Sequence, residues 1–368
     1  MPVAKQIDRP FLFITLALVL LGFFIFISAS LGLLARENIT FSAIALNQLV
    51  SLGIGGALAY AASRTPFRFW NKHALLILGI AIVATLLVFV PGLGFAHGGA
   101  RRWLSFGAFS FQPAELLKLG FVVYWASWIA IARQKITTIT HGVIPLGILL
   151  LISAIILALQ PDMGTVLVIA MTGIAMYIAA GGSWKHIGGL ALAALLALSV
   201  LILFKPYIKD RLLTFVDPSR DPQGSGYQIQ QSLIAIGSGQ WVGRGFGQSI
   251  QKFNFLPEPV GDSIFAVYAE EWGFVGAFIL IVLFVTFLLR GFKIAGRAPT
   301  IFSRTVVVGF SVLIVGQSLI NIASMLGVFP LTGMPLIFVS QGGSALMLAL
   351  AEVGIILNIS RESRSVVA

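Results

Sequence analysis

The residues best suited to chemistry are four carboxylates within residues 251–274, QKFNFLPEPVGDSIFAVYAEEWGF. Glu258, Asp262, Glu270 and Glu271 cross the boundary between a polar, proline-containing segment and an apolar one, although the whole chain has only 13 acidic residues. Burial at such a boundary disfavours the charged form of a carboxyl and raises its pKa. A carboxylate tuned in this way suits general-base catalysis on a polar substrate, and Asp262, where the apolar run begins, is the first candidate.

Asp262 also has a structural interpretation, because Asp is a favoured N-cap residue and a helix is predicted to follow it. Glu270 and Glu271 lie about 12 Å further along that helix, at 1.5 Å per residue. Neighbouring residues diverge by about 100° around a helix, so the two glutamates are not expected to share a face. At least one should point into the protein, as either a functional group or a buried, hydrogen-bonded structural carboxyl.

Other charged residues lie at the ends or in the middle of apolar runs. Glu115 and Lys118 in FQPAELLKL are three residues apart and share a helix face, so they form either an internal ion pair or, through Lys118, a phosphate contact. Asp162 in QPDMGT is predicted in a tight turn, which by itself explains its Pro, Asp and Gly. Glu352 is either a buried structural acid or a proton relay.

Two further features limit the chemistry. Arg101 and Arg102 beside Trp103 are either interfacial anchors or a site for the phosphate of a lipid head group. The chain has no cysteine, which excludes disulfides and thiolate nucleophiles, and its four histidines show no ligand spacing. A zinc site is therefore not expected.

The elements that must position these residues are membrane-spanning helices. The chain of 368 residues is 58% hydrophobic and only 10% charged, against about 25% for soluble domains. Its apolar runs are long enough to cross a hydrocarbon layer of about 30 Å as helices. We predict an all-α polytopic membrane protein with ten spans, at residues 11–34, 41–62, 74–91, 113–132, 143–159, 164–181, 186–204, 263–289, 304–325 and 341–359.

The net charge of +11 is a signal of topology. Basic residues gather in every second connection between the predicted spans, on the side of the N-terminus. The short connections on the opposite side of the membrane contain only Arg36, Arg101 and Arg102. The positive-inside rule then places both termini in the cytoplasm. Nucleic-acid binding, the other explanation of a basic chain, is not expected. The inner segments hold Lys5, Arg9, Arg64, Arg68, Lys72, Arg133, Lys135, Lys185, Arg290, Lys293, Arg297, Arg304, Arg361 and Arg364.

One outer connection is much longer than the others. Residues 205–262 form a large extracytoplasmic loop before the eighth span, and a loop of that length is usually functional. Within it, GYQIQQSLIAIGSG at 226–239 is predicted to form a short amphipathic helix that ends at glycines. No segment has the composition of a separate soluble domain, so residues 1–368 are predicted to be a single membrane domain.

Five motifs, in order along nearly the whole chain, resemble those of the SEDS family of shape, elongation, division and sporulation proteins, typified by FtsW and RodA. They are RRWLSFGAFSFQPAELLKL, QPDMGTVLVI, GYQIQQSLIAIGSG, QKFNFLPEPVGDSIFAVYAEEWGFVGA and LTGMPLIFVSQGGSALM, followed by LNISRE. Ten spans with a large outer loop before the eighth are also this family's architecture. QKFNFLPE and NISRE are most similar to the FtsW branch.

The resemblance implies a peptidoglycan glycosyltransferase that polymerises lipid II at the outer face of the cytoplasmic membrane, at the division septum for the FtsW branch. It implies a class B penicillin-binding protein transpeptidase, other divisome proteins and membrane lipids as partners. Asp262 matches the family's essential acid. Six other residues match polar positions of its motifs and are predicted substrate-binding residues: Arg102, Glu115, Lys118, Asp162, Lys252 and Glu258.

The chemistry expected from the resemblance needs one base. Asp262 would take a proton from an acceptor sugar hydroxyl as it attacks the anomeric carbon of a pyrophosphate-linked sugar, with inversion. Arg102, Lys118 and Lys252 would stabilise the charge on the leaving pyrophosphate. Whether a divalent cation, Mg²⁺ or Mn²⁺, assists them stays open at this point. The chain departs from the family where His-Thr-Asp-Phe is replaced by residues 260–263, VGDS, and where a tyrosine is replaced by Gln341.

Three alternatives remain open at this point. A lipid II flippase or transporter would use the same intramembrane charges to line a path. A non-catalytic scaffold for division proteins would need no acid at position 262. An elongation polymerase of the RodA type would perform the same reaction during side-wall growth.

Overall fold

The computed structural model describes residues 7–35, 41–97, 100–107, 109–204 and 206–363. Each of the ten predicted spans forms a helix, with ends that differ by a few residues. The ten helices are α1 (Arg9–Ser30), α2 (Phe41–Arg64), α4 (Ala74–Leu86), α5 (Pro113–Ala132), α6 (Ile144–Leu159), α7 (Met163–Ala179), α8 (Trp184–Phe204), α11 (Ile264–Ala295), α12 (Ile301–Met325) and α13 (Gly343–Ser363). Of the basic residues used to predict topology, Lys5, Arg36 and Arg364 lie outside the described residues, as does Lys205 of the outer loop.

Composition supports a membrane-spanning fold. Seven helices in the described part of the chain are long and apolar enough to cross a membrane, and three shorter apolar helices cover Ala74–Phe89, Met163–Ala179 and Trp184–Leu196. Many large hydrophobic side chains face outward, among them Leu203 at 81% exposure and Leu75 at 70%. An apolar outer surface is expected of a bundle surrounded by lipid, so the predicted all-α polytopic class is confirmed.

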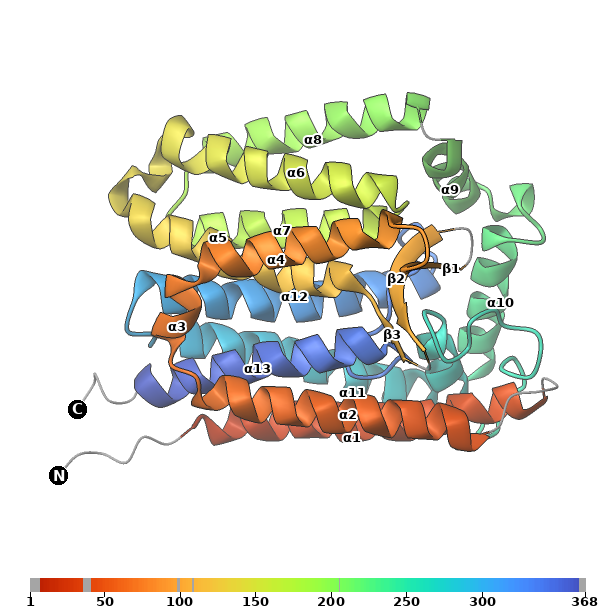
Figure 1. Cartoon of the computed structure of the whole chain (residues 1–368). Coiled ribbons are helices and arrows are strands. Elements are labelled where there is room, and N and C mark those ends of the chain that lie inside the picture. Colours follow the sequence, from red (N-terminus) through yellow and green to blue (C-terminus); the bar gives the residue numbers. More distant parts are fainter. Residues whose placement is uncertain (1–6, 36–40, 98–99, 108, 205, 364–368) are drawn as a thin grey trace.

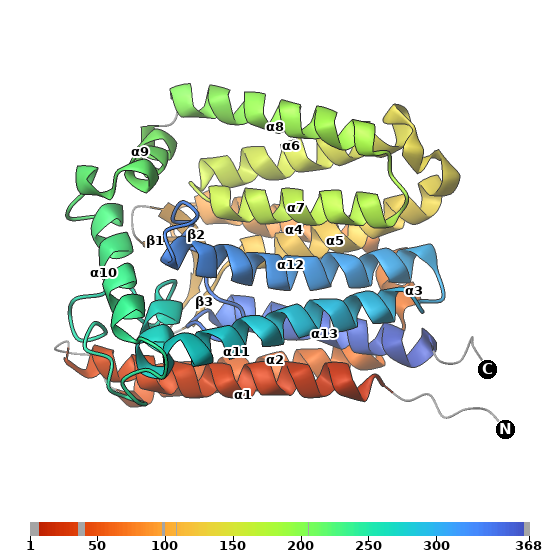
Figure 2. The same cartoon turned by 180° about the vertical axis from the view of Figure 1, so that it is seen from behind.

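The ten helices run side by side, and the two ends of the bundle differ (Figures 1 and 2). The chain termini and the short helix α3 (Phe67–Lys72) lie at one end, which we call the terminal end. The sheet and two short helices, α9 (Pro206–Val216) and α10 (Ser225–Ser238), lie at the other, which we call the loop end. The main helix pairs are α2 with α13, α11 with α12, α4 with α5 and α7 with α12.

The loop end contains one predicted and two unpredicted elements. Helix α10 confirms the amphipathic helix expected at 226–239. Helix α9 was not expected, nor was a three-stranded antiparallel sheet of β1 (Gly94–His97), β2 (Ala100–Phe106) and β3 (Phe109–Phe111). In the register of this sheet Phe95 faces Trp103 and Leu104 faces Phe111, and such pairs of large apolar side chains stabilise neighbouring strands.

Helix α11 is broken at Gly273, whose φ of 64° and ψ of −165° are not helical. The break lets the helix exchange backbone hydrogen bonds with the outer loop: the amides of Phe274 and Val275 donate to the carbonyls of Gln240 and Trp241. In the reverse direction, the carbonyl of Glu270 accepts from the amide of Arg244. The long outer loop is thereby fixed to the bundle.

Between α12 and α13 the chain is irregular but buried. Most of residues 331–340, among them Leu336 and Val339, are buried, although the segment has no helix or strand. Non-helical backbone is tolerated at membrane depth only where protein surrounds it. Helix α1 covers it at Gly22, where a Cβ would overlap the carbonyl oxygen of Phe338.

Candidate active site

Asp262 lies in a tight turn immediately before α11. The carbonyl of Glu258 accepts hydrogen bonds from the amides of Gly261 at 3.0 Å and Ser263 at 3.2 Å, and Glu258 itself has a φ of 46°. Ser263 is the N-cap of α11, and no side chain caps that helix. The N-cap interpretation of Asp262 is therefore wrong, because the turn ends one residue later and leaves the Asp262 carboxylate for other contacts.

The backbone of this turn is held by α12 and by the segment between α12 and α13. The amide nitrogen Nδ2 of Asn321 on α12 donates to the carbonyl of Asp262 and to that of Met334, both at 2.8 Å. Ser340 Oγ donates to the carbonyl of Gly261 at 2.7 Å, and the Gln341 amide donates to Val260 at 2.8 Å. The buried irregular segment after α12 thus serves as the support of the Asp262 turn.

The Asp262 carboxylate itself is partly exposed at the loop end. Its Oδ1 accepts a hydrogen bond from Nε2 of Gln228 on α10 at 3.2 Å, and Nε2 also donates to Ser263 Oγ at 2.9 Å. Burial raises the pKa of Asp262 from 3.8 to about 6; the Gln228 hydrogen bond opposes the rise and the nearby charge of Glu258 adds to it. A carboxyl with this pKa is ionised near neutral pH and still basic enough to accept a proton.

Arg211 on α9 was not among the predicted site residues, but the structure places it at this site. Its Nη1 donates to the carbonyl of Leu331 at 3.1 Å, on the same irregular segment that supports Asp262. Burial and the charge of Arg102 lower the pKa of Arg211, whereas Asp162 and Asp262 raise it. Arg211 therefore lies within electrostatic range of both acids. No sequence motif singles out Arg211, because only the fold brings it close to Asp262.

Arg102 and Asp162 also lie within electrostatic range of Arg211. From strand β2, Arg102 donates through Nε to the carbonyl of Gln160 at 2.9 Å and through Nη2 to that of Pro161. Asp162 caps α7 by accepting from the Thr165 amide at 3.3 Å, which confirms its predicted turn. Its second oxygen, Oδ2, is buried without a hydrogen-bond partner in the described structure.

Tyr207 completes this group of polar side chains. Its hydroxyl is also buried without a partner among the described residues, and the charges of Arg211, Arg102 and Asp162 all act on it. Two unpartnered polar atoms beside two guanidinium groups are unusual, since buried polar atoms are normally hydrogen-bonded. We call Arg102, Asp162, Tyr207, Arg211, Gln228, Glu258 and Asp262 the outer polar cluster.

Glu115 and Lys118 form a separate cluster inside the bundle. Lys118 Nζ is 2.7 Å from Glu115 Oε2 and donates to Gln317 Oε1 at 2.6 Å, which confirms the predicted internal ion pair. Glu352 on α13 is buried close enough for both charges to act on it. In this conformation Lys118 is 1% exposed, so its predicted contact with substrate stays a prediction.

Lys252 belongs to a third cluster, at the break of α11. Its Nζ is 2.7 Å from Glu271 Oε1, and Ser28 Oγ on α1 donates to Glu271 Oε2 at 2.5 Å. Lys252 is completely buried, and Glu271 lies about 10 Å along α11 from the start of that helix. The structure therefore places Lys252 in an internal ion pair, away from the outer polar cluster, and its predicted contact with substrate stays untested.

At least one of Glu270 and Glu271 is predicted to point into the protein, and the structure confirms this prediction. Both are buried and both bind the same loop segment: Ser249 Oγ donates to Glu270 and the Ser249 amide donates to Glu271. The loop can reach both because it crosses α11 at the break near Gly273. These glutamates hold the outer loop to the bundle. In this structure both are buried, hydrogen-bonded structural carboxyls.

Comparison with known proteins extends these observations over the whole chain. The model of the "Cell cycle protein" family of FtsW, RodA and SpoVE matches residues 9–365. Stage V sporulation protein E of Bacillus subtilis is 38% identical over 357 residues, covering 97% of this chain and 98% of its own. A probable peptidoglycan glycosyltransferase FtsW of Thiomicrospira cyclica is 37% identical over 374 residues, covering 98% and 93%.

Solved structures with the same fold include two with clear sequence similarity. One belongs to a peptidoglycan synthase complex that coordinates polymerization and crosslinking; it has a TM-score of 0.78 and 31% identity, covering 97% of this chain and 98% of its own. The other is rod shape determining protein RodA of Thermus thermophilus, with a TM-score of 0.70 and 27% identity, covering 97% of both chains. The similarity therefore includes the outer loop as well as the helices.

Proposed function

Because this chain belongs to the family of FtsW, RodA and SpoVE, we propose that it is a peptidoglycan glycosyltransferase whose general base is Asp262. The observation that carries the proposal is the Asp262 carboxyl, partly exposed at the loop end and with a pKa of about 6. The substrate is lipid II, a disaccharide-pentapeptide on a polyprenyl pyrophosphate. Its sugar and pyrophosphate match the polar, partly basic surroundings of the base.

The reaction forms one glycosidic bond and breaks one bond to pyrophosphate. The C4 hydroxyl oxygen of the acceptor sugar attacks the anomeric carbon of the donor, and Asp262 takes the hydroxyl proton. The bond from the anomeric carbon to the pyrophosphate oxygen breaks, and the pyrophosphate leaves with the electron pair. Direct displacement inverts the donor from an α to a β linkage. Pyrophosphate leaves readily without protonation, so a second acid is not needed.

Cations must stabilise the charge that develops on the pyrophosphate. Arg211 is our first candidate, because it is partly exposed and lies within electrostatic range of Asp262, with Arg102 second. Tyr207 and Asp162 Oδ2 offer unpartnered polar atoms for sugar hydroxyls. The substrate contacts predicted for Glu115, Lys118 and Lys252 would require these buried residues to become accessible.

A divalent cation, Mg²⁺ or Mn²⁺, would fit this site only in part. Among the described residues no three His, Cys, Asp or Glu side chains converge on one point. Asp262 and Glu258 could provide protein oxygens, and the substrate pyrophosphate would have to provide others, as is common for Mg²⁺. Such an ion would neutralise leaving-group charge.

The site requires a defined orientation in the membrane. We propose the bacterial cytoplasmic membrane as the location, with the loop end outside and both termini in the cytoplasm, in agreement with the positive-inside pattern. Similarity to a synthase complex that coordinates polymerization and crosslinking supports a class B penicillin-binding protein as partner. Similarity to FtsW supports work at the septum with other divisome proteins, and similarity to RodA keeps an elongation role as the alternative.

The test is polymerisation of lipid II by the purified chain in detergent, alone and with the cognate transpeptidase. Asp262→Asn should lower the rate by about 10²- to 10⁴-fold, the usual contribution of a general base. Asp217→Asn is the matched control, because Asp217 is an exposed acid of the same outer segment that pairs with Arg220. If Asp262→Asn polymerises lipid II at the wild-type rate, Asp262 is not the general base.

Two further arms separate the alternatives. Substrate presented in micelles needs no transport, so a flippase or a scaffold would make no glycan, whereas a transferase would. Addition of EDTA followed by Mg²⁺ or Mn²⁺ tests the cation: a rate that falls and recovers assigns it a role, and an unchanged rate leaves the arginines as the only charges at the leaving group.

A further inference from the structure

The outer loop carries large apolar side chains that the rest of the described chain does not cover. Trp241 and Val242, which come shortly after α10, are 71% and 79% exposed, and Phe246 is also exposed. Large apolar side chains that gather on a protein surface mark a contact with another molecule or with a membrane. The reaction at Asp262 does not use these side chains. Residues 241–247, WVGRGFG, therefore need a separate explanation.

This segment continues the outer surface of α11. The Trp241 ring meets the Phe274 ring edge-on, with the centroids 5.3 Å apart, and Phe274 stacks on Phe278, about one turn further along α11, at 6.1 Å. Phe274 and Phe278 are exposed on the apolar surface that the bundle presents to lipid. Ring contacts thus connect the loop to a membrane-spanning helix. We call Trp241, Phe274 and Phe278 the outer aromatic patch.

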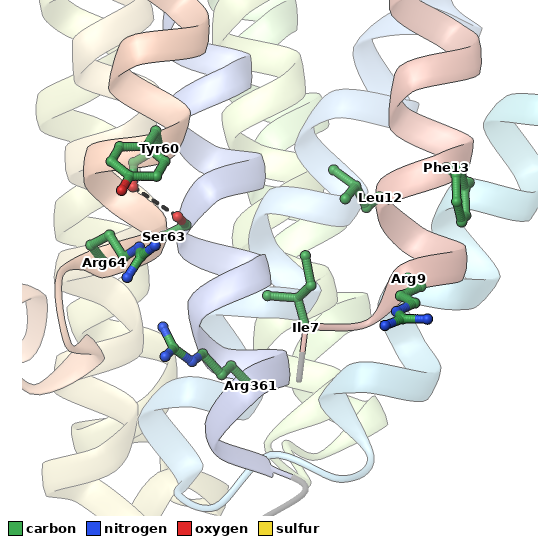
Figure 3. Close-up of a pocket in the computed structure, with 8 residues that line it drawn as sticks. All are labelled: Ile7, Arg9, Leu12, Phe13, Tyr60, Ser63, Arg64 and Arg361. Atoms are coloured by element: carbon green, nitrogen blue, oxygen red, sulfur yellow. Dashed lines mark hydrogen bonds between the residues drawn. The ribbon is translucent and has the colours of Figure 1, made fainter. Parts of the chain in front are cut away.

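Charged residues at the terminal end provide a reference for depth. Figure 3 shows Arg9 and Arg64 at the terminal ends of α1 and α2, on the lining of a cavity of about 610 Å³. Arg290 of α11 lies at the same level, because it donates to both oxygens of Asp8, immediately before α1, at 2.8 Å. A charge within hydrocarbon is costly, so these residues mark one edge of the hydrocarbon layer.

Two helices measure the distance from this edge to the outer loop. Residues 274–289 of α11 include no charged residue. At 1.5 Å per residue, Phe274 lies about 24 Å from Arg290, and Ser28 of α1 lies about 29 Å from Arg9. The hydrocarbon layer is about 30 Å thick. Its other edge therefore lies at, or a few ångströms beyond, the level of Phe274 and Ser28.

Both ends of the loop segment are held at this level. The carbonyl of Trp241 accepts a hydrogen bond from the amide of Val275 on α11 at 3.1 Å. The amide of Gly247 donates to Ser28 Oγ on α1 at 3.2 Å. Residues 241–247 thus run from α11 to α1 across the edge of the hydrocarbon layer.

The charge and hydrogen bonds of the segment suit an interfacial location. Its single charged residue, Arg244, is paired with the buried Glu270, whose Oε1 is 3.3 Å from Nε. The amides of Gly243, Arg244 and Gly245 donate to carbonyls of the protein at 2.8–3.0 Å. Irregular backbone near hydrocarbon requires such partners. Tryptophan is enriched at the membrane–water interface, because its ring is apolar and its N–H is polar.

We propose that residues 241–247 lie in the interfacial layer of the leaflet at the loop end, with the side chains of Trp241 and Val242 among the first carbons of the acyl chains. Phospholipid covers the outer aromatic patch and holds the outer loop at the level of the head groups. This membrane contact does not depend on Asp262. One consequence rests on the proposed function: a lipid-linked substrate carries its pyrophosphate at the same level, so the contact keeps the loop level with the reacting groups.

The test exploits a sequence without cysteine. Val242→Cys is labelled with bimane and reconstituted in phosphatidylcholine nanodiscs without any partner protein. Phosphatidylcholine with a 5-doxyl acyl chain should quench the label, and aqueous iodide should not. Ile279→Cys, at an exposed position of α11, is the lipid control, and Gln223→Cys, in an exposed turn before α10, is the water control. Quenching of the label at position 242 by iodide alone would overturn the proposal and would leave the patch to a protein partner.

Two further arms check the position and the depth. Trp241→Cys supplies a second label site, which also serves if labelled Val242→Cys does not fold, and it should give the same pattern; a label there that only iodide reaches would contradict the proposal. A 16-doxyl chain carries its quencher near the bilayer centre and should quench less than the 5-doxyl chain. Stronger quenching by the 16-doxyl lipid would rule out an interfacial depth.

The consequence for catalysis is tested with W241S/V242S, whose polymerisation of lipid II is measured in liposomes and in detergent. The rate should fall in liposomes and stay near the wild-type rate in detergent, where no leaflet fixes the loop. A wild-type rate in liposomes, or an equal loss in both media, would contradict the anchoring role. Inactive wild-type protein would instead count against the proposed function, and the quenching results would still decide the membrane contact.

Discussion

The side-chain amide of Gln228 on α10 donates a hydrogen bond to Asp262 Oδ1 over 3.2 Å, across 34 residues of chain. The same nitrogen donates to Ser263 Oγ over 2.9 Å, so one amide connects α10 to the turn that presents the base. A hydrogen bond to a carboxylate favours its charged form, whereas the neighbouring charge of Glu258 disfavours it. The basicity of Asp262 is therefore set by two opposing neighbours that can be changed one at a time.

The first prediction concerns the pH dependence of polymerisation. A general base works when ionised, so the rate should rise with pH through about 6, the pKa of Asp262. Gln228→Leu should move this acidic limb to higher pH, because it removes a hydrogen bond that lowers the pKa. Glu258→Gln should move it to lower pH, because it removes a charge that raises the pKa. Rate profiles from pH 4.5 to 8 check both; shifts in the same direction would contradict the assignment.

The second prediction concerns stability. The folded pKa of Asp262 is about 6 and its unfolded value is about 3.8, so the unfolded chain releases this proton first as the pH rises. The ionised carboxyl therefore costs stability, and the cost grows between about pH 4 and pH 6. Asp262→Asn should be more stable than wild type at pH 7, by up to about 3 kcal/mol, and by only about 0.5 kcal/mol at pH 4. Thermal unfolding in detergent at the two pH values measures this, and a less stable variant at pH 7 would be the contrary result.

The third prediction concerns the buried pair of Lys252 and Glu271. Lys252→Met leaves Glu271 buried without its cation and should cost about 3–5 kcal/mol of stability. The double variant with Glu271→Gln removes both charges and should recover most of that loss. If the pair is purely structural, the folded double variant should also polymerise lipid II. A stable but inactive double variant would instead support the substrate contact that the sequence predicts for Lys252.

The fourth prediction concerns the break in α11. Gly273 has a φ of 64°, and a Cβ there would overlap the backbone nitrogen of Gly243. Gly273→Ala should therefore destabilise the chain by at least about 1–3 kcal/mol and loosen the loop that carries the Asp262 turn. Gly56→Ala on α2 is the control, since its Cβ would meet nothing within 4 Å and alanine favours a helix. Limited proteolysis of residues 239–262 in both variants reports on the loop.

The sequence by itself determined the features that depend on short stretches of chain. Apolar runs long enough to cross a bilayer predicted all ten long helices, because in lipid a backbone must satisfy its own hydrogen bonds. The spacing of Glu115 and Lys118 predicted their ion pair, since residues three apart share a helix face. The position of Asp262 at the start of an apolar run predicted a half-buried acid at the membrane edge.

Only the tertiary structure decided which polar residues meet. Lys252 and Arg211 are both cations of the same outer loop, yet Lys252 is enclosed against Ser28 and Glu271 whereas Arg211 lies within electrostatic range of Asp262. The difference arises because α11 breaks at Gly273 and captures one part of the loop, while the irregular segment after α12 binds another. These contacts join residues dozens to hundreds of positions apart. No local pattern encodes them, because burial and electrostatics depend on what the folded chain brings alongside.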